Sequence, residues 1–526
     1  MEAAFERPIV RWSRRGGWTA VAILAHLPLA VLAAESLFSK GRLSLENYEP
    51  LFAPRVLGLF AESVLLASLG TAIACGAGVA LAIAIEMRSV PLRRAWRMAA
   101  LAPLLLPPYM QVAAWRPMLL SGTGGSEAGN FFSAALLLGF SHAPWMFYFA
   151  SQGIRGISGE ILDAARLSVR GERRVIFRIV LPLSAPAAAV GAALVFLFIL
   201  LDPETPSLLF VPALATEIFS RVAQGPGAAF AIASPALAAL LLLVGAADGW
   251  SRRRGFAVTS GQDPRAARAP GASGIGAIAL ASTLAAIVLV FPVIRLLSMA
   301  GWGRRIGEAW ALHGASVLDS IPVIAGAALL AALLAFLCAV RSGRPSRSTS
   351  AWAWAVLAAP GTLLGAAFLR VWNLPGLDGI YESRWILILA GAARFFPIAY
   401  HALSAHLRTV PRELWEAADL APISAWERLR LVSLPLCAPG LVLAAAAVAV
   451  LQGGEVAAAV LLAPPGHRPL AVEISSALHY SVDLEVPAAL CLFQIATTLA
   501  VAGGFRLAGL WAQGGIAFPK MAFPRA

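Results

Sequence analysis

The sequence is poor in charged residues. Only 13% of its 526 residues are Asp, Glu, Lys or Arg, 59% are hydrophobic, and the mean hydropathy is +0.77. Since soluble globular domains carry about 25% charged residues, this chain has too little polar surface to cover a soluble globule of its size. The scarcity of charge excludes a soluble domain and places the chain in a lipid bilayer.

Several chemical signatures are also missing. The four cysteines lie in or beside apolar stretches without Cys-x-x-Cys spacing, which indicates packing residues and not disulfides or metal ligands. No Gly-x-x-x-x-Gly-Lys-Ser/Thr occurs, so the chain has no P-loop for a nucleotide. The seven histidines lack ligand spacing, and no converging catalytic set stands within the apolar stretches. We therefore expect no enzymatic activity, no metal site and no cofactor.

Long apolar stretches are abundant. A helix of about 20 apolar residues crosses roughly 30 Å of hydrocarbon, and twelve such stretches can be marked along the chain. In the first half they are approximately Trp18–Leu37, Ser63–Ile85, Met98–Leu120, Phe131–Ser151, Leu183–Leu201 and Ala228–Ala247. In the second half they are approximately Gly276–Met299, Ser320–Val340, Trp352–Trp372, Trp385–Leu403, Leu436–Leu451 and Pro487–Trp511. The sequence predicts an all-α polytopic membrane protein with about twelve transmembrane helices.

The formal net charge of +13 fits this topology. If the amino terminus is cytoplasmic, most of the 41 Lys and Arg residues fall in cytoplasmic connections, as the positive-inside rule expects. No basic run belongs to a soluble fold that could enter a nucleic-acid groove, so we expect a lipid bilayer and no nucleic acid as the partner of these charges. Arg11, Arg14 and Arg15 could also precede a secretory signal, but eleven further spans favour a retained first helix.

A short stretch occurs twice in the chain. Asp163-Ala164-Ala165 is followed by Leu181-Pro182, and Glu416-Ala417-Ala418 is followed at the same spacing by Leu434-Pro435. The copies lie 253 residues apart (416 − 163), and Pro144–Pro186 aligns with Pro397–Pro439 without a gap. This shared register indicates an internal duplication.

The duplication extends beyond this stretch. Ala102-Pro103 matches Ala359-Pro360 at an offset of 257 (359 − 102), and Glu62-Ser63 matches Asp319-Ser320 at the same offset. We therefore expect two homologous six-helix halves, 1–250 and 275–526, joined by a cytoplasmic linker at 251–274 that is rich in Gly, Pro, Ala and Arg. Two parallel repeats imply a pseudo-two-fold axis along the membrane normal, with a transport pathway between the halves.

Each repeated segment follows a fourth span and precedes a fifth, which puts both on the cytoplasmic side. Glu160, Ala164 and Leu167 fall on one helical stripe, as do the equivalent Glu413, Ala417 and Leu420. Pro182 and Pro435 stand where the next span begins, a position that tolerates a missing N–H.

These segments resemble the EAA loops of ABC importer permeases, whose pattern is Glu-Ala-Ala, then a glycine, then Leu-Pro. Two such loops in one chain resemble the fused branch of ferric-iron and thiamine importers, and Gly454-Glu455 followed by Leu461-Leu462-Ala463-Pro464 is similar to its ferric members. The chain departs from the pattern where Val169 and Pro422 replace the glycine, although Gly171 stands two residues beyond Val169, and where Asp163 replaces glutamate.

The resemblance implies the function of a permease that moves a small polar solute by alternating access. Ferric iron is the first expected substrate, and thiamine or another small polar solute the next. Two ATPase subunits would bind the two loops on the cytoplasmic side, an extracytoplasmic substrate-binding protein would deliver the solute, and the permease would lie in the bacterial cytoplasmic membrane. The ATPase-coupling residues would be Asp163, Ala164, Ala165, Gly171, Leu181, Pro182, Glu416, Ala417, Ala418, Leu434 and Pro435.

Two questions stay open at the level of sequence. Glu204 and Glu455 each follow a fifth span, and they could face the transport pathway or lie in a watery outer loop. A secondary transporter with two parallel repeats, driven by an ion gradient, is the alternative function. It predicts paired ionisable residues at mid-membrane, whereas this chain concentrates its charges in the connections.

Overall fold

The computed structural model describes residues 8–39, 41–88, 90–253, 274–340, 347–481 and 483–515. The part of the chain that it describes is all-α apart from one two-stranded antiparallel pair, β1 (Phe38–Ser39) with β2 (Arg42–Leu43). The prediction of an all-α polytopic membrane protein is confirmed. The expected linker at 251–274 falls, from residue 254 to residue 273, outside the described residues.

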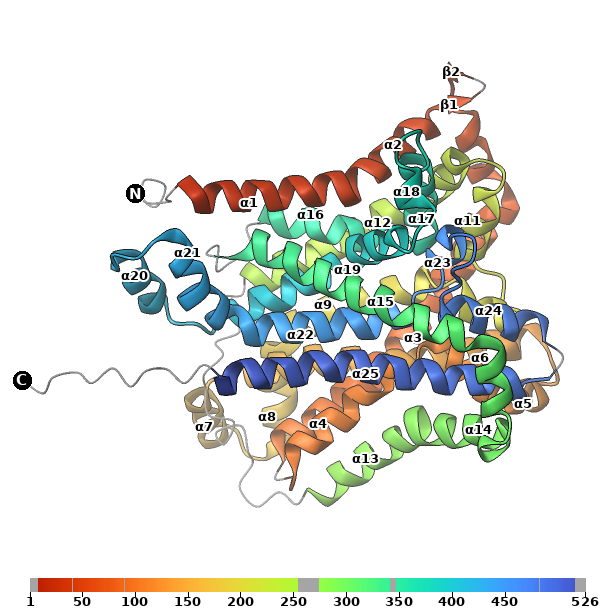
Figure 1. Ribbon diagram of the computed structural model, residues 1–526. Helices are drawn as coiled ribbons and strands as arrows, with labels where there is room; N and C mark the ends of the chain where they lie inside the picture. The colour runs from red at the N-terminus through yellow and green to blue at the C-terminus, as the bar shows by residue number, and fades with distance from the viewer. Residues whose placement is uncertain are drawn as a thin grey trace, which may run out of the picture.

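The helices run in two successive sets. The first comprises α1 (Pro8–Val21), α2 (Leu27–Ser36), α3 (Pro54–Met87), α4 (Arg93–Leu101), α5 (Pro108–Thr123), α6 (Glu127–Arg155), α7 (Gly159–Ser168), α8 (Glu172–Val175), α9 (Leu181–Leu200), α10 (Glu204–Leu208), α11 (Leu214–Val222) and α12 (Pro226–Arg253). The second comprises α13 (Ile275–Ala285), α14 (Phe291–Met299), α15 (Ile306–Ala339), α16 (Arg347–Ala358), α17 (Gly361–Trp372), α18 (Asp378–Tyr381), α19 (Trp385–Leu407), α20 (Arg412–Leu420), α21 (Ala425–Arg428), α22 (Leu434–Gly453), α23 (Ala459–Leu462), α24 (Leu470–Tyr480) and α25 (Glu485–Gly515). The long helices lie side by side along one common direction (Figure 1).

The described residues contain nine helices that are long and apolar enough to cross a membrane, or eleven spans if each of two sharply bent helix pairs counts as one. The remaining expected stretch, Phe131–Ser151, lies within α6, which is 29 residues long. Polar residues weaken the apolar character of α6, but Asn130, Ser133 and His142 on it are buried inside the protein.

The two sets repeat in detail. Ser63 Oγ, on α3, accepts a hydrogen bond of 2.8 Å from the backbone N–H of Leu214, at the start of α11. Ser320 Oγ, on α15, accepts the same bond from Leu470, at the start of α24, also at 2.8 Å. Matching contacts between matching elements extend the duplicated sequence pattern into three dimensions.

A π-helical turn before a proline is another repeated feature. A five-residue π-helical turn precedes each of four Leu-Pro or Phe-Pro pairs, at Ala22–His26, Ile176–Val180, Ala286–Val290 and Leu429–Ser433. Proline has no N–H and its ring crowds the carbonyl four residues earlier. The wider π turn relieves this clash within a continuous helix. Pro182 and Pro435 therefore lie in the first turns of α9 and α22, but the expectation that the spans begin there is wrong, because the helical spans start earlier, at Glu172 and Ala425.

The third span of each set is broken. The helix pair around α4 and α5 bends by 82°, and α16 with α17 bends by 96°. Pro107 and Pro360 cap α5 and α17 with similar backbone angles (φ −51°, ψ 150° and φ −52°, ψ 144°). The predicted match of Ala102-Pro103 to Ala359-Pro360 is therefore wrong, because Pro103 lies in a 3₁₀ turn before the break. The structural partner of Pro360 is Pro107, at the offset of 253 that the repeated stretch also has.

The first span of each set packs on the other set. Helix α1 lies against α15, where a Cβ on Gly17 would stand 3.1 Å from the backbone carbon of Leu337. Trp18 stacks edge-on against Phe396 and Tyr400 of α19. Reciprocally, α13 packs on α3 and α4. This exchange ties the two sets into one bundle.

Candidate functional site

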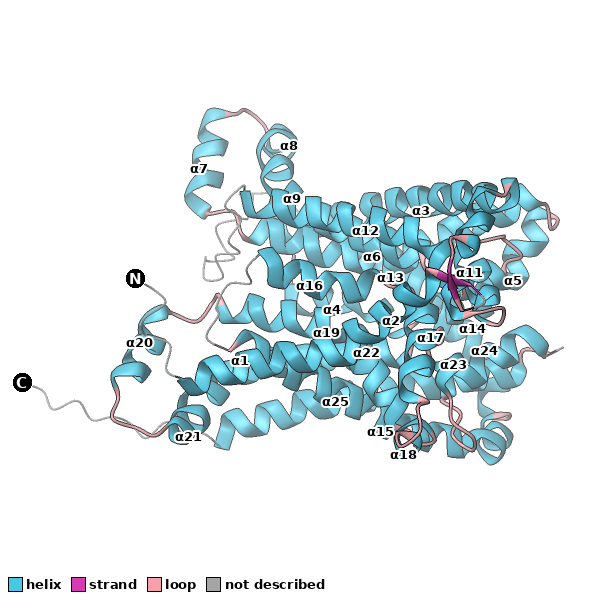
Figure 2. Cartoon of the chain, turned by 90° about the horizontal axis from the view of Figure 1, so that it is seen from above, coloured by secondary structure: helices cyan, strands magenta, loops and turns pink. Residues whose placement is uncertain are grey.

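The repeated sequence stretches form two short helical hairpins, α7 with α8 and α20 with α21, which we call the coupling hairpins. Both lie at the same end of the molecule, opposite the end that carries α11 and α24 (Figures 1 and 2). They extend beyond the bundle of long helices in both views. A surface of this kind, present twice at one end, can be contacted by a second protein.

The exposed surface of the hairpins is nearly identical. Leu167 is 90% exposed and its equivalent Leu420 is 87% exposed, while Ile161 and Leu414 are 48% and 47% exposed. Asp163, Ala164, Glu416 and Ala417 are exposed as well, whereas Ala165 and Ala418 are buried and hold each helix to its own hairpin. Each hairpin thus offers an apolar stripe with small residues and one adjacent carboxylate. Fully exposed leucines at two matched positions indicate a surface that another protein covers.

The first coupling hairpin is held by short-range polar contacts. Ser158 caps α7 by accepting a hydrogen bond of 3.3 Å from the N–H of Ile161. Arg166 joins α7 to α8, with its Nη2 3.3 Å from an Oε of Glu172 and its Nη1 3.4 Å from an Oδ of Asp163. Gly171 makes the turn with φ +93° and ψ 127°, a conformation that residues with a Cβ rarely adopt. Gly171 therefore does supply a glycine turn in this loop, displaced from Val169.

The second coupling hairpin is built differently. Its turn uses extended backbone at Ala421 before Pro422, and Ser424 with Glu427 forms a capping box at the start of α21. The backbone N–H of Ser424 donates to Glu427 Oε2 at 2.8 Å, and the Ser424 hydroxyl accepts from the N–H of Glu427 at 3.2 Å. Arg428 Nη1 lies 2.8 Å from Asp419 Oδ1 and joins the two helices. Different residues thus preserve the same hairpin in the two halves.

Substituting Gly171 with alanine tests the turn of the first hairpin. We expect a cost of about 1–3 kcal/mol, because alanine is strained at this backbone conformation even though no atom lies within 4 Å of a Cβ there. Amide hydrogen exchange in α7 and α8 should become correspondingly faster. Gly245→Ala, in the helical part of α12 with equally open surroundings, is the control and should leave exchange in α7 unchanged.

Each coupling hairpin continues into a long span. From Glu172 to Leu200, and from Ala425 to Gly453, the chain forms one helical span of 29 residues that includes the π turn and the Leu-Pro pair. Helices α8 and α9, and likewise α21 and α22, are therefore parts of one continuous helical span. This places Leu181-Pro182 and Leu434-Pro435 at the joint between hairpin and span.

Glu204 and Glu455 lie at the far ends of these spans, and neither is in open solvent. The Glu204 side chain is 17% exposed; its Oε2 accepts a hydrogen bond of 2.8 Å from Ser475 and lies 3.9 Å from His479 Nδ1, both on α24 of the other half. Burial raises the pKa of Glu204, and the contacts with Ser475 and His479 oppose that rise. Glu204 thus links α10 to α24 across the two sets of helices.

Glu455 forms a buried ion pair that the sequence analysis missed. Its Oε2 lies 2.6 Å from Arg394 Nε on α19, and the two side chains are 8% and 12% exposed. Arg394 Nη1 also donates a hydrogen bond of 3.2 Å to the carbonyl of Ala359, at the break between α16 and α17. The sequence did contain a signal for this pair: Arg394 lies inside a predicted span, where a charge is costly unless an opposite charge pairs with it.

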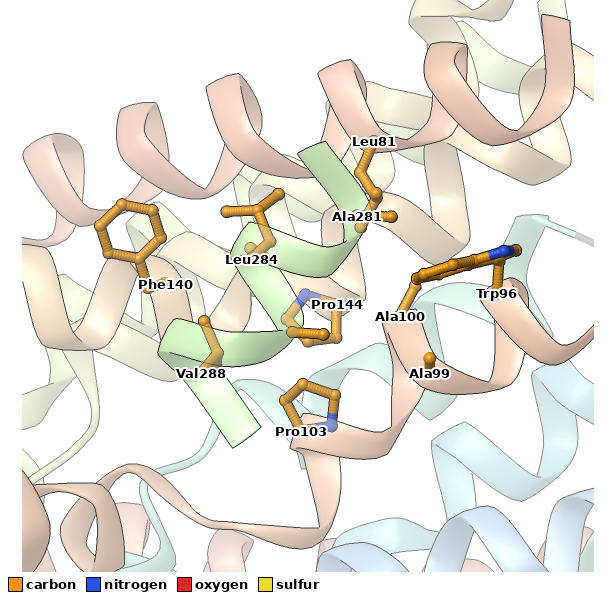
Figure 3. A pocket seen from close by; sticks show the side chains of 12 residues that line it. Leu81, Trp96, Ala99, Ala100, Pro103, Phe140, Pro144, Ala281, Leu284 and Val288 are labelled. Carbon is orange, nitrogen blue, oxygen red and sulfur yellow. The ribbon is translucent and has the colours of Figure 1, made fainter. Parts of the chain in front are cut away.

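A hollow beside α13 has a different character. It is lined only by apolar and aromatic side chains from α3, α4, α6, α13 and the turns that follow α4 and α13, among them Leu81, Trp96, Phe140, Leu284 and Val288 (Figure 3). No charged side chain reaches it, so it offers nothing to orient a polar solute. Among the described residues, no group of three or more His, Cys, Asp or Glu side chains could hold a metal ion.

Comparison with known proteins yields a consistent assignment. Residues 327–510 match the family described as binding-protein-dependent transport system inner membrane component. The chain is 30% identical over 197 residues to the putative 2-aminoethylphosphonate transport system permease protein PhnV of Salmonella paratyphi A, covering 36% of this chain and 73% of that protein. It is 38% identical over 78 residues to the inner membrane ABC transporter permease protein YcjO of Escherichia coli K12, covering 14% and 27%.

The matched region of the family, 327–510, contains the second coupling hairpin, the span α22 and the Arg394–Glu455 pair. The chain therefore belongs to the inner-membrane permease components of binding-protein-dependent ABC transporters.

Proposed function

We propose that this chain is a fused, two-half permease of an ATP-driven importer, with residues 1–250 and 275–526 as its halves and 251–274 as the linker. The observation that carries the proposal is the pair of matched coupling hairpins at one end of the molecule. A permease assembled from two separate chains needs only one such hairpin per chain. Two hairpins in one chain supply both ATPase contacts.

The proposed mechanism is alternating access. Closure of two ATPase subunits around ATP draws the two hairpins together, and the rigid 29-residue spans carry that movement to the ends where Glu204 and Glu455 lie. The contact itself would be made by the exposed faces of α7 and α20. The chain supplies the pathway, and nucleotide chemistry takes place on its partners.

Membership of this permease family implies that the chain works with an ATPase and a substrate-binding protein. It also implies a multi-pass protein of the bacterial inner membrane. Our proposal adds two ATPase subunits on the cytoplasmic side, a binding protein on the opposite side and a cytoplasmic amino terminus. The positive-inside distribution of Lys and Arg supports this orientation.

Two kinds of solute compete as substrate. Ferric iron, with thiamine next, follows from the resemblance of the doubled loops and of the Gly454-Glu455 segment to the ferric and thiamine importers. An aminoalkylphosphonate is supported by the similarity to PhnV, which is named as a putative 2-aminoethylphosphonate permease. If iron is the substrate, its ligands belong on the binding protein, because the described residues hold no metal-binding group.

A reconstitution experiment tests the proposal. The full chain is co-expressed with the ATPase and the substrate-binding protein of its own transport system and placed in proteoliposomes. Uptake of ferric citrate, thiamine and 2-aminoethylphosphonate is then measured. We expect ATP-dependent uptake of one of these solutes and a complex with two ATPase subunits per chain. Uptake that follows an ion gradient without ATP would instead establish the secondary transporter.

A further inference from the structure

The second half contains a cluster of buried polar side chains at the meeting of α19, α22 and α25. Its members are Arg394, Gln452, Glu455, Gln494 and Thr498, each at most 12% exposed. Gln494 Nε2 donates a hydrogen bond of 3.1 Å to Thr498 Oγ1. The side-chain oxygens of Gln452 and Gln494 have no hydrogen-bond partner within the described chain. Unsatisfied buried polar atoms in a membrane bundle are costly and indicate that something else satisfies them.

Glycines make room for this cluster. A Cβ on Gly391 would stand 2.0 Å from Gln452 Oε1, and one on Gly453 would stand 2.4 Å from Thr498 Oγ1. A Cβ on Gly361, at the start of α17, would stand 2.7 Å from Glu455 Oε1. Three close approaches of backbone to polar side chains mean that the surrounding helices are shaped around the cluster.

The arginine and the glutamine of the cluster have no equivalent in the first half. At the offset of 253, Arg394 corresponds to Ser141 and Gln452 to Ile199, whereas Glu455 corresponds to Asp202, so the acid occurs in both halves and the paired cation in one. The Ser141 hydroxyl donates its hydrogen bond to the carbonyl of Leu137, on its own helix. A polar feature needed for the fold would be expected in both halves, so its presence in one half points to recognition.

The cluster also lies at the junction of the halves. Gly454 packs against the ring of Pro107, at the break of the third span of the first half. Tyr109, two residues beyond Pro107, is 3% exposed, its hydroxyl has no partner in the described chain, and it lies within electrostatic reach of Glu204 and Glu455. Both broken spans therefore contribute to the surroundings of the Arg394–Glu455 pair.

The pair itself restricts which solutes can bind. A buried cation and anion satisfy each other, and a solute with one charge that binds one of them leaves the other uncompensated. A solute with a positive group and a negative group replaces both partners at once. Arg394 presents planar donors suited to a phosphonate or carboxylate, and Glu455 accepts from an ammonium group.

We propose that the Arg394–Glu455 cluster is a solute-binding site selective for dipolar solutes, in which Arg394 receives an anionic oxygen group and Glu455 an ammonium group. This inference rests on the proposed permease function. The amide groups of Gln452 and Gln494 and the hydroxyl of Tyr109 complete the polar contacts of the solute when the two halves separate.

Equilibrium binding to the full chain in lipid nanodiscs tests the proposal with three probes of similar size. These are 2-aminoethylphosphonate with both charges, ethylphosphonate with the anion only, and ethylamine with the cation only. We expect the first to bind at least about tenfold more tightly than either of the others. The double variant R394Q/E455Q removes both charges together, so it avoids an unpaired buried charge, and it should lose this preference.

The variant R370Q/E35Q, which removes both members of a more exposed ion pair between α17 and α2 at once, is the matched control and should keep the preference. Equal binding of the three probes, no binding of any, or an unchanged preference in R394Q/E455Q would overturn the inference. The proposed function is tested separately, by whether the permease stimulates ATP hydrolysis by the ATPase that binds its coupling hairpins, and none of these binding results bears on that stimulation. Failure of that stimulation in the wild-type complex is the separate result that would remove the proposed function itself.

Discussion

Glu416→Lys is expected to abolish ATP-driven uptake while the protein still inserts and folds. Glu416 is exposed on α20 and has no ion-pair partner in the described part of the chain, so its replacement breaks no internal contact. Coupling energies between close charges across a protein interface reach about 1.5–7 kcal/mol, and reversing one charge replaces that attraction by repulsion. We therefore expect at least about a tenfold loss in ATPase binding and a matching loss of uptake.

Two comparisons make this result specific. Asp163→Lys at the equivalent position also removes the contact with Arg166, so it should reduce uptake and loosen the first hairpin as well. Glu382→Lys, exposed after α18 at the opposite end of the molecule, should leave ATPase binding unchanged. Binding isotherms of the purified ATPase with nanodisc-embedded permease provide the measurement. Wild-type affinity in Glu416→Lys would mean that α20 is not the contact.

The coupling hairpins were predictable because their information is local. A carboxylate, two alanines, a break and a Leu-Pro pair each fix backbone or surface within a few residues, and the duplication supplied an internal test. Even the departures had local solutions, since Gly171 takes the positive φ and Pro422 ends the helix in the other copy. The assignment of these residues as ATPase contacts stays a prediction.

The buried ion pair and the exchange of first spans depend on distant segments. Arg394 and Glu455 are neighbours only because α19 packs on α22, and no spacing in the sequence encodes that contact. The same holds for α1 against α15, where the contact forms at Gly17. Glu204 follows the span α9 in the sequence, but its partners Ser475 and His479 come from the other half.

Helix α6 illustrates how tertiary packing overrides composition. The apolar stretch Phe131–Ser151 predicted a span here, yet polar side chains keep α6 below the hydropathy of the other spans. Two of those side chains are buried and bonded within their own helix: Ser141 Oγ donates to the Leu137 carbonyl at 2.7 Å, and His142 Nδ1 lies 2.8 Å from the Leu138 carbonyl. A high mean hydropathy is needed where a helix faces lipid. Helix α6 packs mainly on α3 and α9, so it can carry polar side chains.

Gly78→Val is expected to have the largest effect on folding. A Cβ on Gly78 would stand 2.6 Å from the carbonyl oxygen of Ala143 and 2.7 Å from the backbone nitrogen of Phe147, on α6. These are backbone atoms, which cannot turn aside as a flexible side chain can. Helices α3 and α6 approach this closely because small residues face each other, a common device in membrane bundles. Overpacking costs about 1–3 kcal/mol even where side chains can adjust.

We therefore expect Gly78→Val to lower the melting temperature in detergent and to reduce the yield of monodisperse protein severalfold. Gly76→Val is the matched control, because Gly76 lies on the same helix, undergoes the same change of helix propensity when replaced by valine, and has no atom within 4 Å of a Cβ. Valine at 76 should change stability by less than about 1 kcal/mol. If the two variants melt alike, helix propensity and not the α3–α6 contact governs stability, and the close approach of the two backbones does not hold the first half together.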